Sequence, residues 1–183
     1  IKSSYHKAPE IQQKILKSLV ENSKKTAFGT EHNFDEIKNH DDFIKRVPVR
    51  DYEQLKKYIE RIKKGELDIL WPGKPKYLAK TSGTTSGVKQ IPITNESMPN
   101  HILSARNALL FYIYETGKTN FLNGKTIFIQ GSPILNSING IFEGRLSGIV
   151  AHHVPKYLRK NNLPTFKTNS IEDLSLIHIS EPT

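Results

Sequence analysis

Apolar side chains recur every three or four residues in three segments of the chain, the spacing that lines one face of an α-helix. The first segment runs from Pro9 to Asn22, and Pro9 suits a first helical turn. The second follows Asp51, whose side chain can cap a helix start, and ends at Gly65. Between them, residues 35–47 indicate short helical turns. The apolar faces of the two helices carry Ile11, Ile15 and Leu19, and Leu55, Tyr58, Ile59 and Ile62, and we expect both faces to pack.

A third, longer helix is expected after Thr94 or Asn95, either of which can cap it, and should end near Gly117. Its apolar face carries Met98, Ile102, Ala105, Leu109 and Tyr112. Because these positions follow the helical period, we expect the whole face to lie in the core.

Two stretches have the short apolar runs of β-strands. Residues 76–80 form the first, and the extended segment 91–93 follows it after a loop. Residues 124–131, which contain Thr126-Ile127-Phe128-Ile129, predict a buried strand. The order strand, loop, helix, strand is typical of α/β proteins, so we expect an α/β fold with an incomplete sheet and flanking helices.

The loop between residues 80 and 90 is rich in hydroxyl groups and glycine and is closed by a lysine. It reads Thr81, Ser82, Gly83, Thr84, Thr85, Ser86, Gly87, Val88 and Lys89. Hydroxyl groups and the N–H groups of glycine-rich backbone can donate to phosphate oxygens, and a lysine adds positive charge. A flexible linker is the alternative, but the apolar extended segments on both sides favour a phosphate-binding loop at the carboxyl end of a strand. The Gly-Lys-Ser/Thr ending of a Walker loop is absent.

Two arginines are candidate ligands for a substrate carboxylate. Arg106 is the one arginine on the helix after the loop, and a guanidinium group can hold a carboxylate through two parallel hydrogen bonds. An exposed helix arginine is the alternative interpretation. Arg145, between Gly144 and Leu146, is a second candidate.

The adjacent His152 and His153 invite a metal interpretation, which we reject. Neighbouring side chains on an extended segment point to opposite sides, and no nearby carboxylate or histidine has ligand spacing. We expect one ring to be packed and the other to be solvated or hydrogen-bonded to the backbone. Glu143 is expected to form a local ion pair with Arg145.

Composition narrows the class of protein. The 183 residues are 36% hydrophobic and 25% charged, and no run approaches the roughly 18 apolar residues of a membrane span. The absence of cysteine suits a cytoplasmic location. The net charge of +9 raises nucleic-acid binding, but the lysines are scattered in pairs among acidic residues rather than gathered in one stripe. We therefore expect neither a nucleic-acid partner nor a membrane.

The loop also resembles the AMP-binding signature of adenylate-forming enzymes, commonly Thr-Ser-Gly-Thr-Thr-Gly-x-Pro-Lys. Ser86 stands at the usual glycine and Val88 at the usual proline, which is similar to the Gretchen Hagen three acyl-acid amido synthetases, also called the auxin-responsive promoter family. Further motifs follow this family's order, and the later ones resemble its bacterial members. They are Phe28-Gly29-Thr30, Val47-Pro48-Val49, Asp51-Tyr52-Glu53, Leu70-Trp71-Pro72-Gly73, Gly131-Ser132-Pro133, Gly144-Arg145-Leu146-Ser147-Gly148 and His152-His153-Val154-Pro155.

This resemblance implies the amino-terminal part of the large domain of an adenylate-forming enzyme. ATP would activate a carboxylic acid as acyl-AMP, and an amino acid would then displace AMP to give an amide. The resemblance assigns the β- and γ-phosphates to Thr81 through Lys89, assisted by Mg²⁺. An acyl-CoA ligase and a non-catalytic nucleotide-binding module remain alternatives.

The resemblance covers residues 1–173, which we expect to be a partial adenylation domain. Residues 174–183 resemble translated sequencing-adapter sequence and are expected to be a non-native tail, with a native amphipathic tail as the alternative. The chain starts at Ile1 and lacks the family's Tyr-x-x-Ser-Glu-type adenine segment and Tyr-Arg-x-Gly-Asp-type ribose segment. It is therefore expected to be a fragment that does not complete catalysis alone.

Overall fold

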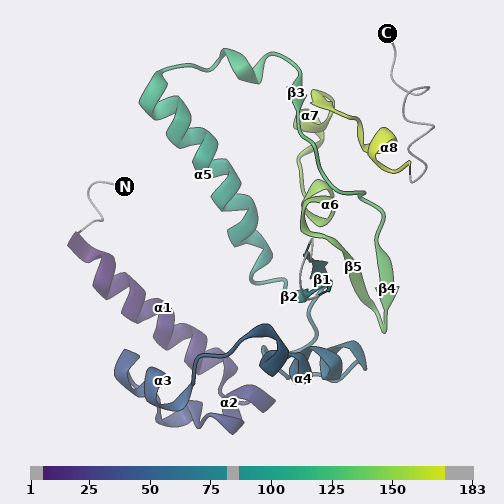
Figure 1. The fold of residues 1–183 in the computed structure, drawn as a ribbon. Helices are drawn as coiled ribbons and strands as arrows, with labels where there is room; N and C mark the ends of the chain where they lie inside the picture. Colours follow the sequence, from purple (N-terminus) through teal and green to yellow (C-terminus); the bar gives the residue numbers. More distant parts are fainter. Residues whose placement is uncertain (1–5, 82–86, 172–183) are drawn as a thin grey trace. The chain divides into compact units, whose positions relative to one another are not determined.

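A computed structural model describes residues 6–81 and 87–171 of the chain (Figure 1). The chain divides into two compact units, residues 1–75 and residues 76–183. Each unit has its own secondary structure and is described by itself.

The first unit is helical, as its sequence pattern predicts. Its elements are α1 (Ala8–Ser23), α2 (Ala27–Glu31), the short 3₁₀ helix η2 (Phe34–Glu36), α3 (His40–Arg46) and α4 (Tyr52–Lys63). The Asp51 side chain accepts a hydrogen bond from the Gln54 N–H at 2.9 Å, and the Gln54 side chain accepts one from the Asp51 N–H at 3.1 Å. This reciprocal pair is a capping box, so the predicted helix start after Asp51 is confirmed.

An aromatic cluster forms the centre of the first unit. The Phe28 ring stacks on His32 at 4.2 Å between centroids and meets Tyr58 edge-on at 5.2 Å. Tyr58, Ile59 and Ile62 of α4 are buried, which confirms the predicted packing face of that helix. The predicted packing face of α1 is wrong, because its Ile11, Ile15 and Leu19 are exposed. The residues of α1 that are buried, Val20 and Ser23, lie in its last turns, where the chain folds back into α2.

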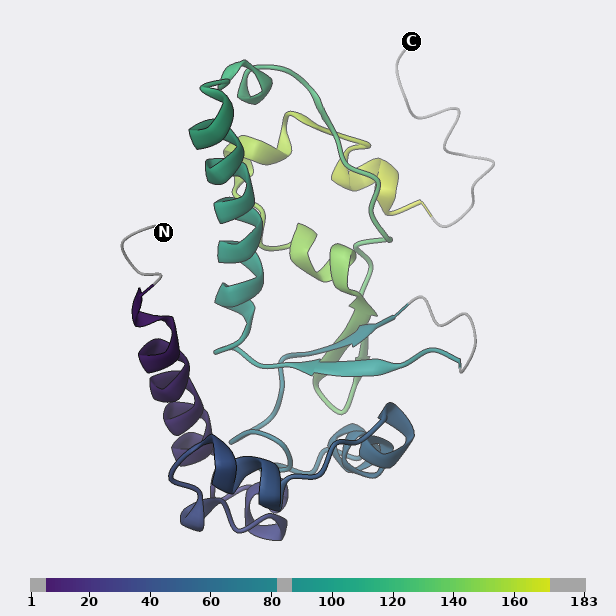
Figure 2. The same cartoon turned by 60° about the vertical axis from the view of Figure 1, so that its left-hand side comes forward.

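The second unit is built on a four-stranded mixed sheet (Figure 2). Its strands, in spatial order, are β2 (Gln90–Ile93), β1 (Tyr77–Lys80), β5 (Ile141–Arg145) and β4 (Asn136–Ile138). Strands β1 and β5 are parallel, and the other two neighbouring pairs are antiparallel. The predicted α/β class with a small incomplete sheet is confirmed.

Helices and short segments complete the second unit. They are α5 (Met98–Thr116), η3 (Asn120–Leu122), α6 (Leu146–Ala151), α7 (Lys156–Arg159), α8 (Phe166–Asn169) and the parallel pair β3 (Thr126–Ile127) and β6 (Asn162–Leu163). The core consists of Tyr77, Ala79, Ile93, Met98 and Ile149. It therefore holds β1, β2, the first turn of α5 and α6 together.

Two predictions of burial are wrong in this unit. Helix α5 ends as expected, at Gly117 with a φ of +67°, but it begins at Met98 after Ser97 rather than directly after Thr94 or Asn95, and Leu109 and Tyr112 are 49% and 46% exposed. In the predicted buried strand, Ile127 and Ile129 are 74% and 89% exposed. The reason is that α5 packs on the core at its amino-terminal turns, through Met98 and Ile102, while β3 belongs to a sheet of two short strands.

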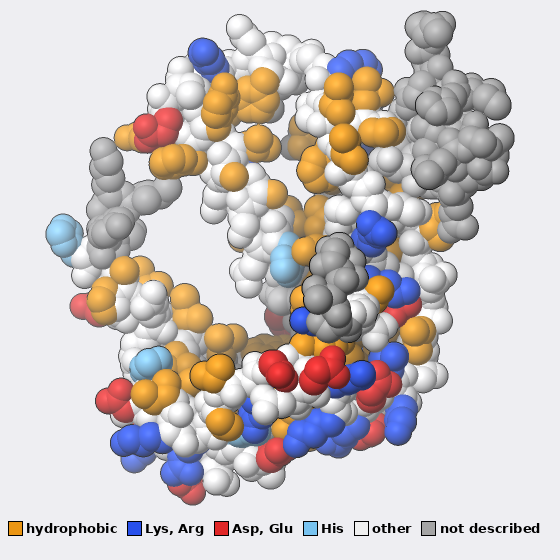
Figure 3. All heavy atoms as spheres, in the orientation of Figure 1, with side chains coloured by type: hydrophobic (Ala, Val, Ile, Leu, Met, Phe, Trp, Pro, Cys, Tyr) orange, Lys and Arg blue, Asp and Glu red, His pale blue; other side chains and the backbone are white. Residues whose placement is uncertain are grey.

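Hydrophobic side chains consequently reach the surface along both α1 and α5 (Figure 3). None of the described helices combines the length and the apolar character needed to cross a bilayer.

Candidate functional site

The hydroxyl- and glycine-rich loop connects two antiparallel strands of the sheet. It leaves β1 after Lys80 and enters β2 at Gln90, and these two residues are paired in the strand register. The loop therefore begins at the carboxyl end of β1, as predicted. The Thr81 N–H donates to the Lys89 carbonyl at 2.9 Å, and the Lys89 N–H donates to the Thr81 hydroxyl at 3.3 Å. These two bonds join the first and last residues of the loop.

The middle of the predicted phosphate-binding loop lies outside the described residues. This part consists of Ser82, Gly83, Thr84, Thr85 and Ser86. The exit is described: Gly87 has a φ of +79°, in the region that glycine favours, and an added Cβ would have no atom within 4 Å. Lys89 is half-buried where β2 begins.

Arg145 is the candidate arginine that the structure places at the edge of the sheet where the loop begins. It ends β5 and pairs in parallel register with Lys80, the residue just before the loop. Arg106 is exposed on α5, where its guanidinium group donates to the Asn107 side chain at 3.3 Å. Within residues 6–81 and 87–171, no hydrogen bond links Arg106 to the loop.

Two glycine motifs from distant parts of the sequence pack against each other beside Arg145. The Gly131 N–H donates to the Ser147 hydroxyl at 2.9 Å. A Cβ added at Gly148 would lie 2.1 Å from the Ser132 carbonyl oxygen, and one added at Gly131 would lie 2.5 Å from the Arg145 Cδ. At Gly148 glycine is needed because the two backbones approach so closely, whereas at Gly131 an added Cβ would displace the Arg145 side chain.

A buried carboxylate joins three strands at the residues that flank the loop. Glu143 of β5 is 6% exposed, its Oε2 lies 2.6 Å from the Lys80 Nζ of β1, and its Oε1 accepts a hydrogen bond from the Gln90 amide of β2. The predicted ion pair of Glu143 with Arg145 is therefore wrong. Donors on the neighbouring strands reach the carboxylate, whereas the Arg145 side chain covers Gly131.

The sequence interpretation missed this three-residue cluster. One signal was available, because Glu143 stands two positions after the apolar Ile141 and so shares its inward face of the strand. A carboxylate in such a position must find a hydrogen-bonding or charged partner.

The two histidines follow α6 and are not on an extended segment, which corrects that part of the prediction. The His152 Nε2 donates to the Pro133 carbonyl at 2.7 Å, and the half-buried His153 shares a hydrogen bond of 3.0 Å with the Tyr77 hydroxyl. This is the predicted arrangement, in which one ring is hydrogen-bonded to the backbone and the other is packed. Among the described residues, no group of three His, Cys, Asp or Glu side chains could hold a metal ion.

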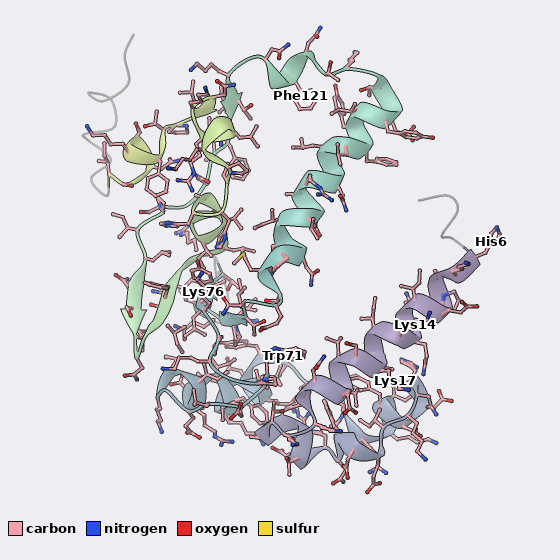
Figure 4. All side chains as sticks on the ribbon, turned by 180° about the vertical axis from the view of Figure 1, so that it is seen from behind. His6, Lys14, Lys17, Trp71, Lys76 and Phe121 are labelled. Carbon is pink, nitrogen blue, oxygen red and sulfur yellow. The ribbon has the colours of Figure 1, made fainter. Side chains whose placement is uncertain are left out.

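We predict that His153 makes stability depend on pH. Burial, reinforced by the positive charge of Lys76, lowers the pKa of His153 below its usual value. Lys76 is labelled in Figure 4 and directly precedes β1. The unfolded chain then binds the proton more readily, so the free energy of unfolding should fall as the pH drops below about 6.5. Urea unfolding at about pH 7.5 and about pH 5.5 measures this loss.

The variant His153→Gln should lose part of the pH dependence, since glutamine can bond to Tyr77 but does not titrate in this range. The exposed His101→Gln is the matched control and should keep the wild-type dependence. Glu31 should not disturb this measurement. The hydrogen bond from Tyr58 lowers the pKa of Glu31, so protonation of that carboxylate reduces stability only at more acidic pH. Identical pH profiles for wild type and His153→Gln would contradict the prediction.

Comparison with known proteins assigns the family. The sequence model of the GH3 family N-terminal domain matches residues 1–173. The chain belongs to the GH3 family. This confirms the resemblance carried by the loop and by the ordered motifs; the closer likeness to bacterial members stays a prediction, as does the domain boundary after residue 173.

Two curated GH3 relatives have similar sequences. Indole-3-acetic acid-amido synthetase GH3.15 from Arabidopsis thaliana is 29% identical over 147 residues, which is 70% of this chain and 24% of the relative. Jasmonoyl–L-amino acid synthetase JAR4 from Nicotiana attenuata is 26% identical over 140 residues, or 75% of this chain and 24% of the relative. The chain thus spans about a quarter of the length of these relatives.

Two solved GH3 structures have the same fold. The GH3.15 acyl acid amido synthetase superposes with a TM-score of 0.74 at 22% identity, over 92% of this chain and 30% of that chain. The AtGH3.15 acyl acid amido synthetase in complex with 2,4-DB gives a TM-score of 0.63 at 25% identity, over 84% and 26%. The arrangement of strands and helices described above is therefore that of the corresponding part of a GH3 synthetase.

Proposed function

We propose that this chain is the amino-terminal part of an ATP-dependent acyl-acid amido synthetase. In this proposal a carboxylic acid is activated as acyl-AMP and then joined to an amino acid. The observation that carries it is the hydroxyl- and glycine-rich loop at the carboxyl end of β1, in a chain that belongs to the GH3 family. The names of the two curated relatives, an acid-amido synthetase and an acyl–amino acid synthetase, support the same class of reaction.

Charge explains why such a loop suits this reaction. A carboxylate must approach the α-phosphate of a polyanionic nucleotide, so the site has to neutralise charge and hold the pyrophosphate that leaves. The described end of the loop fits a phosphate, because Gly87 has a positive φ in open space and Lys89 follows it. We propose that the loop holds the β- and γ-phosphates of ATP. The groups that would bind them are the side chains of Thr81 and Lys89, the backbone at Gly87, the N–H of Gly83 and the hydroxyl groups of Ser82, Thr84, Thr85 and Ser86. Mg²⁺ bound to the phosphates would supply further neutralisation.

The proposed reaction has two steps. A carboxylate oxygen forms a bond to the α-phosphorus and the bond to pyrophosphate breaks. The amino group of an amino acid then forms a bond to the acyl carbon, loses a proton, and the bond to AMP breaks. Arg106 is the proposed ligand for the acid's carboxylate, and Arg145, at the sheet edge where the loop begins, is the second candidate.

Product analysis of the full-length protein tests the proposal. Purified protein is incubated with ATP, a panel of carboxylic acids and amino acids, and the products are identified by mass spectrometry. We expect an amide, AMP and pyrophosphate, all dependent on the acid. A thioester formed with coenzyme A instead of an amide would favour an acyl-CoA ligase, and ATP binding without any pyrophosphate release would favour a nucleotide-binding module.

A further inference from the structure

One buried carboxylate connects both ends of the candidate loop. Lys80 directly precedes Thr81, and Gln90 directly follows Lys89. The side chains of Lys80 and Gln90 both end on Glu143, one on each carboxylate oxygen. A single residue of β5 thus contacts the strand that enters the loop and the strand that leaves it.

Burial distinguishes this contact from the other ion pairs of the described chain. The Glu143 side chain is 7% exposed and the Lys80 side chain 34%. The carboxylates of the other six ion pairs are 42–67% exposed. Exposed pairs of that kind hold little in place, whereas removing one partner of a buried pair leaves an uncompensated charge in a poorly solvated site. The Glu143 cluster is therefore able to fix the backbone on either side of it.

The strand register explains what the cluster fixes. Lys80 pairs with Gln90 on one side and with Arg145 on the other, so the three strands meet at the level of the loop. A long loop sets the pairing of its two strands only weakly, and a polar contact with a defined partner specifies that pairing better than an apolar one. Displacing either strand end would move Lys89 relative to Thr81 and Arg145.

We infer that Glu143 is a positioning residue: through Lys80 and Gln90 it fixes the two ends of the candidate phosphate loop and so places Lys89. This inference rests on the proposed function of the loop. It predicts that Glu143 acts on the binding and reaction of the nucleotide without touching it.

The test uses the full-length protein and the variant Glu143→Gln, which keeps the size of the side chain but leaves the Lys80 ammonium without its counter-charge. Acid-dependent pyrophosphate exchange should show a KM for ATP about tenfold higher, because small misplacements of binding groups have effects of this size or larger. Lower stability alone would reduce the amount of active enzyme and leave the KM for ATP unchanged. An unchanged KM for ATP in Glu143→Gln would overturn the inference while leaving the proposed function intact.

A second variant covers the case in which Glu143→Gln does not fold. Gln90→Leu retains the Lys80–Glu143 pair and removes the hydrogen bond to Glu143 at the loop exit, so a smaller rise in the KM for ATP is expected. Glu66→Gln is the matched control, since it breaks the exposed Arg61–Glu66 pair of the first unit and should leave the KM unchanged.

A measurement that does not require enzyme activity separates the inference from the proposed function. Hydrogen–deuterium exchange of peptides containing Thr81 and Lys89 should be faster in Glu143→Gln and Gln90→Leu than in wild type, and unchanged in α4. Faster exchange in the two variants, together with no pyrophosphate exchange by the wild-type protein, would reject the proposed function alone. Equal exchange rates in all variants would reject the positioning role.

Discussion

Replacement of Lys89 by alanine in the full-length protein is expected to lower kcat/KM for acid-dependent pyrophosphate exchange by about 10²–10³-fold, the effect of removing one preorganised charge-stabilising donor. Lys89 closes the loop at the point where β2 begins, and its positive charge would oppose the negative charge that develops on the leaving pyrophosphate. The two hydrogen bonds that hold Lys89 to Thr81 use only the Lys89 backbone. Alanine therefore removes the charge and keeps those bonds.

Two further variants serve as controls for Lys89→Ala. Lys89→Arg keeps the charge but replaces a compact ammonium by a planar group, so it should recover only part of the rate. Lys118→Ala removes an exposed lysine just after α5 and should leave the rate unchanged. A Lys89→Ala enzyme as fast as Lys118→Ala would show that Lys89 has no part in handling the phosphates.

Local sequence signals predicted the long helices and strands β1 and β2, but they did not predict β4, β5 or the short helices after residue 145. The helix after Asp51 has a capping residue, an apolar stripe and a terminal glycine within a short segment, and α4 has the expected start and buried face. The loop was likewise predictable at the carboxyl end of β1, because an apolar strand precedes it directly. Such signals depend only on residues close in sequence.

Burial depends on what covers an element, and the sequence of that element does not contain this information. The period of α5 predicted a core face, yet the structure covers Met98 and partly Ile102 and leaves Leu109 exposed. The same limit applies to β3, whose apolar residues were typical of a central strand but belong to a two-stranded sheet. A local pattern states which side chains prefer burial, not whether a second layer is present.

The candidate site was predictable only as far as the loop. The contact between Gln90 and Glu143 joins residues 53 positions apart, and the approach of Arg145 to the loop follows from parallel pairing of β1 and β5. Neither relation has a signal in the neighbouring sequence. The carboxylate of Glu143 on the same strand face as Ile141 was the one clue, and it indicated the need for a partner without naming it.

Residues 1–183 expressed alone are expected to give no acid-dependent pyrophosphate exchange, a complete loss relative to the full-length protein. These residues contain neither the adenine nor the ribose segment of the family, and they span about a quarter of the length of the curated relatives. The loop by itself would bind phosphates without orienting the α-phosphate toward a carboxylate, and orientation accounts for a large part of such a rate.

The surface of the second unit also predicts how residues 1–183 behave when they are expressed alone. Leu110 and Phe111 of α5 are 52% and 50% exposed, and Ile129 beyond β3 is 89% exposed, so large apolar side chains of this unit reach the solvent. We expect residues 1–183 to associate at micromolar concentration, as measured by light scattering, whereas the full-length protein should not. Pyrophosphate exchange by residues 1–183 that depends on the added acid would refute the prediction that these residues are inactive alone, because it would mean that they are sufficient to orient both substrates.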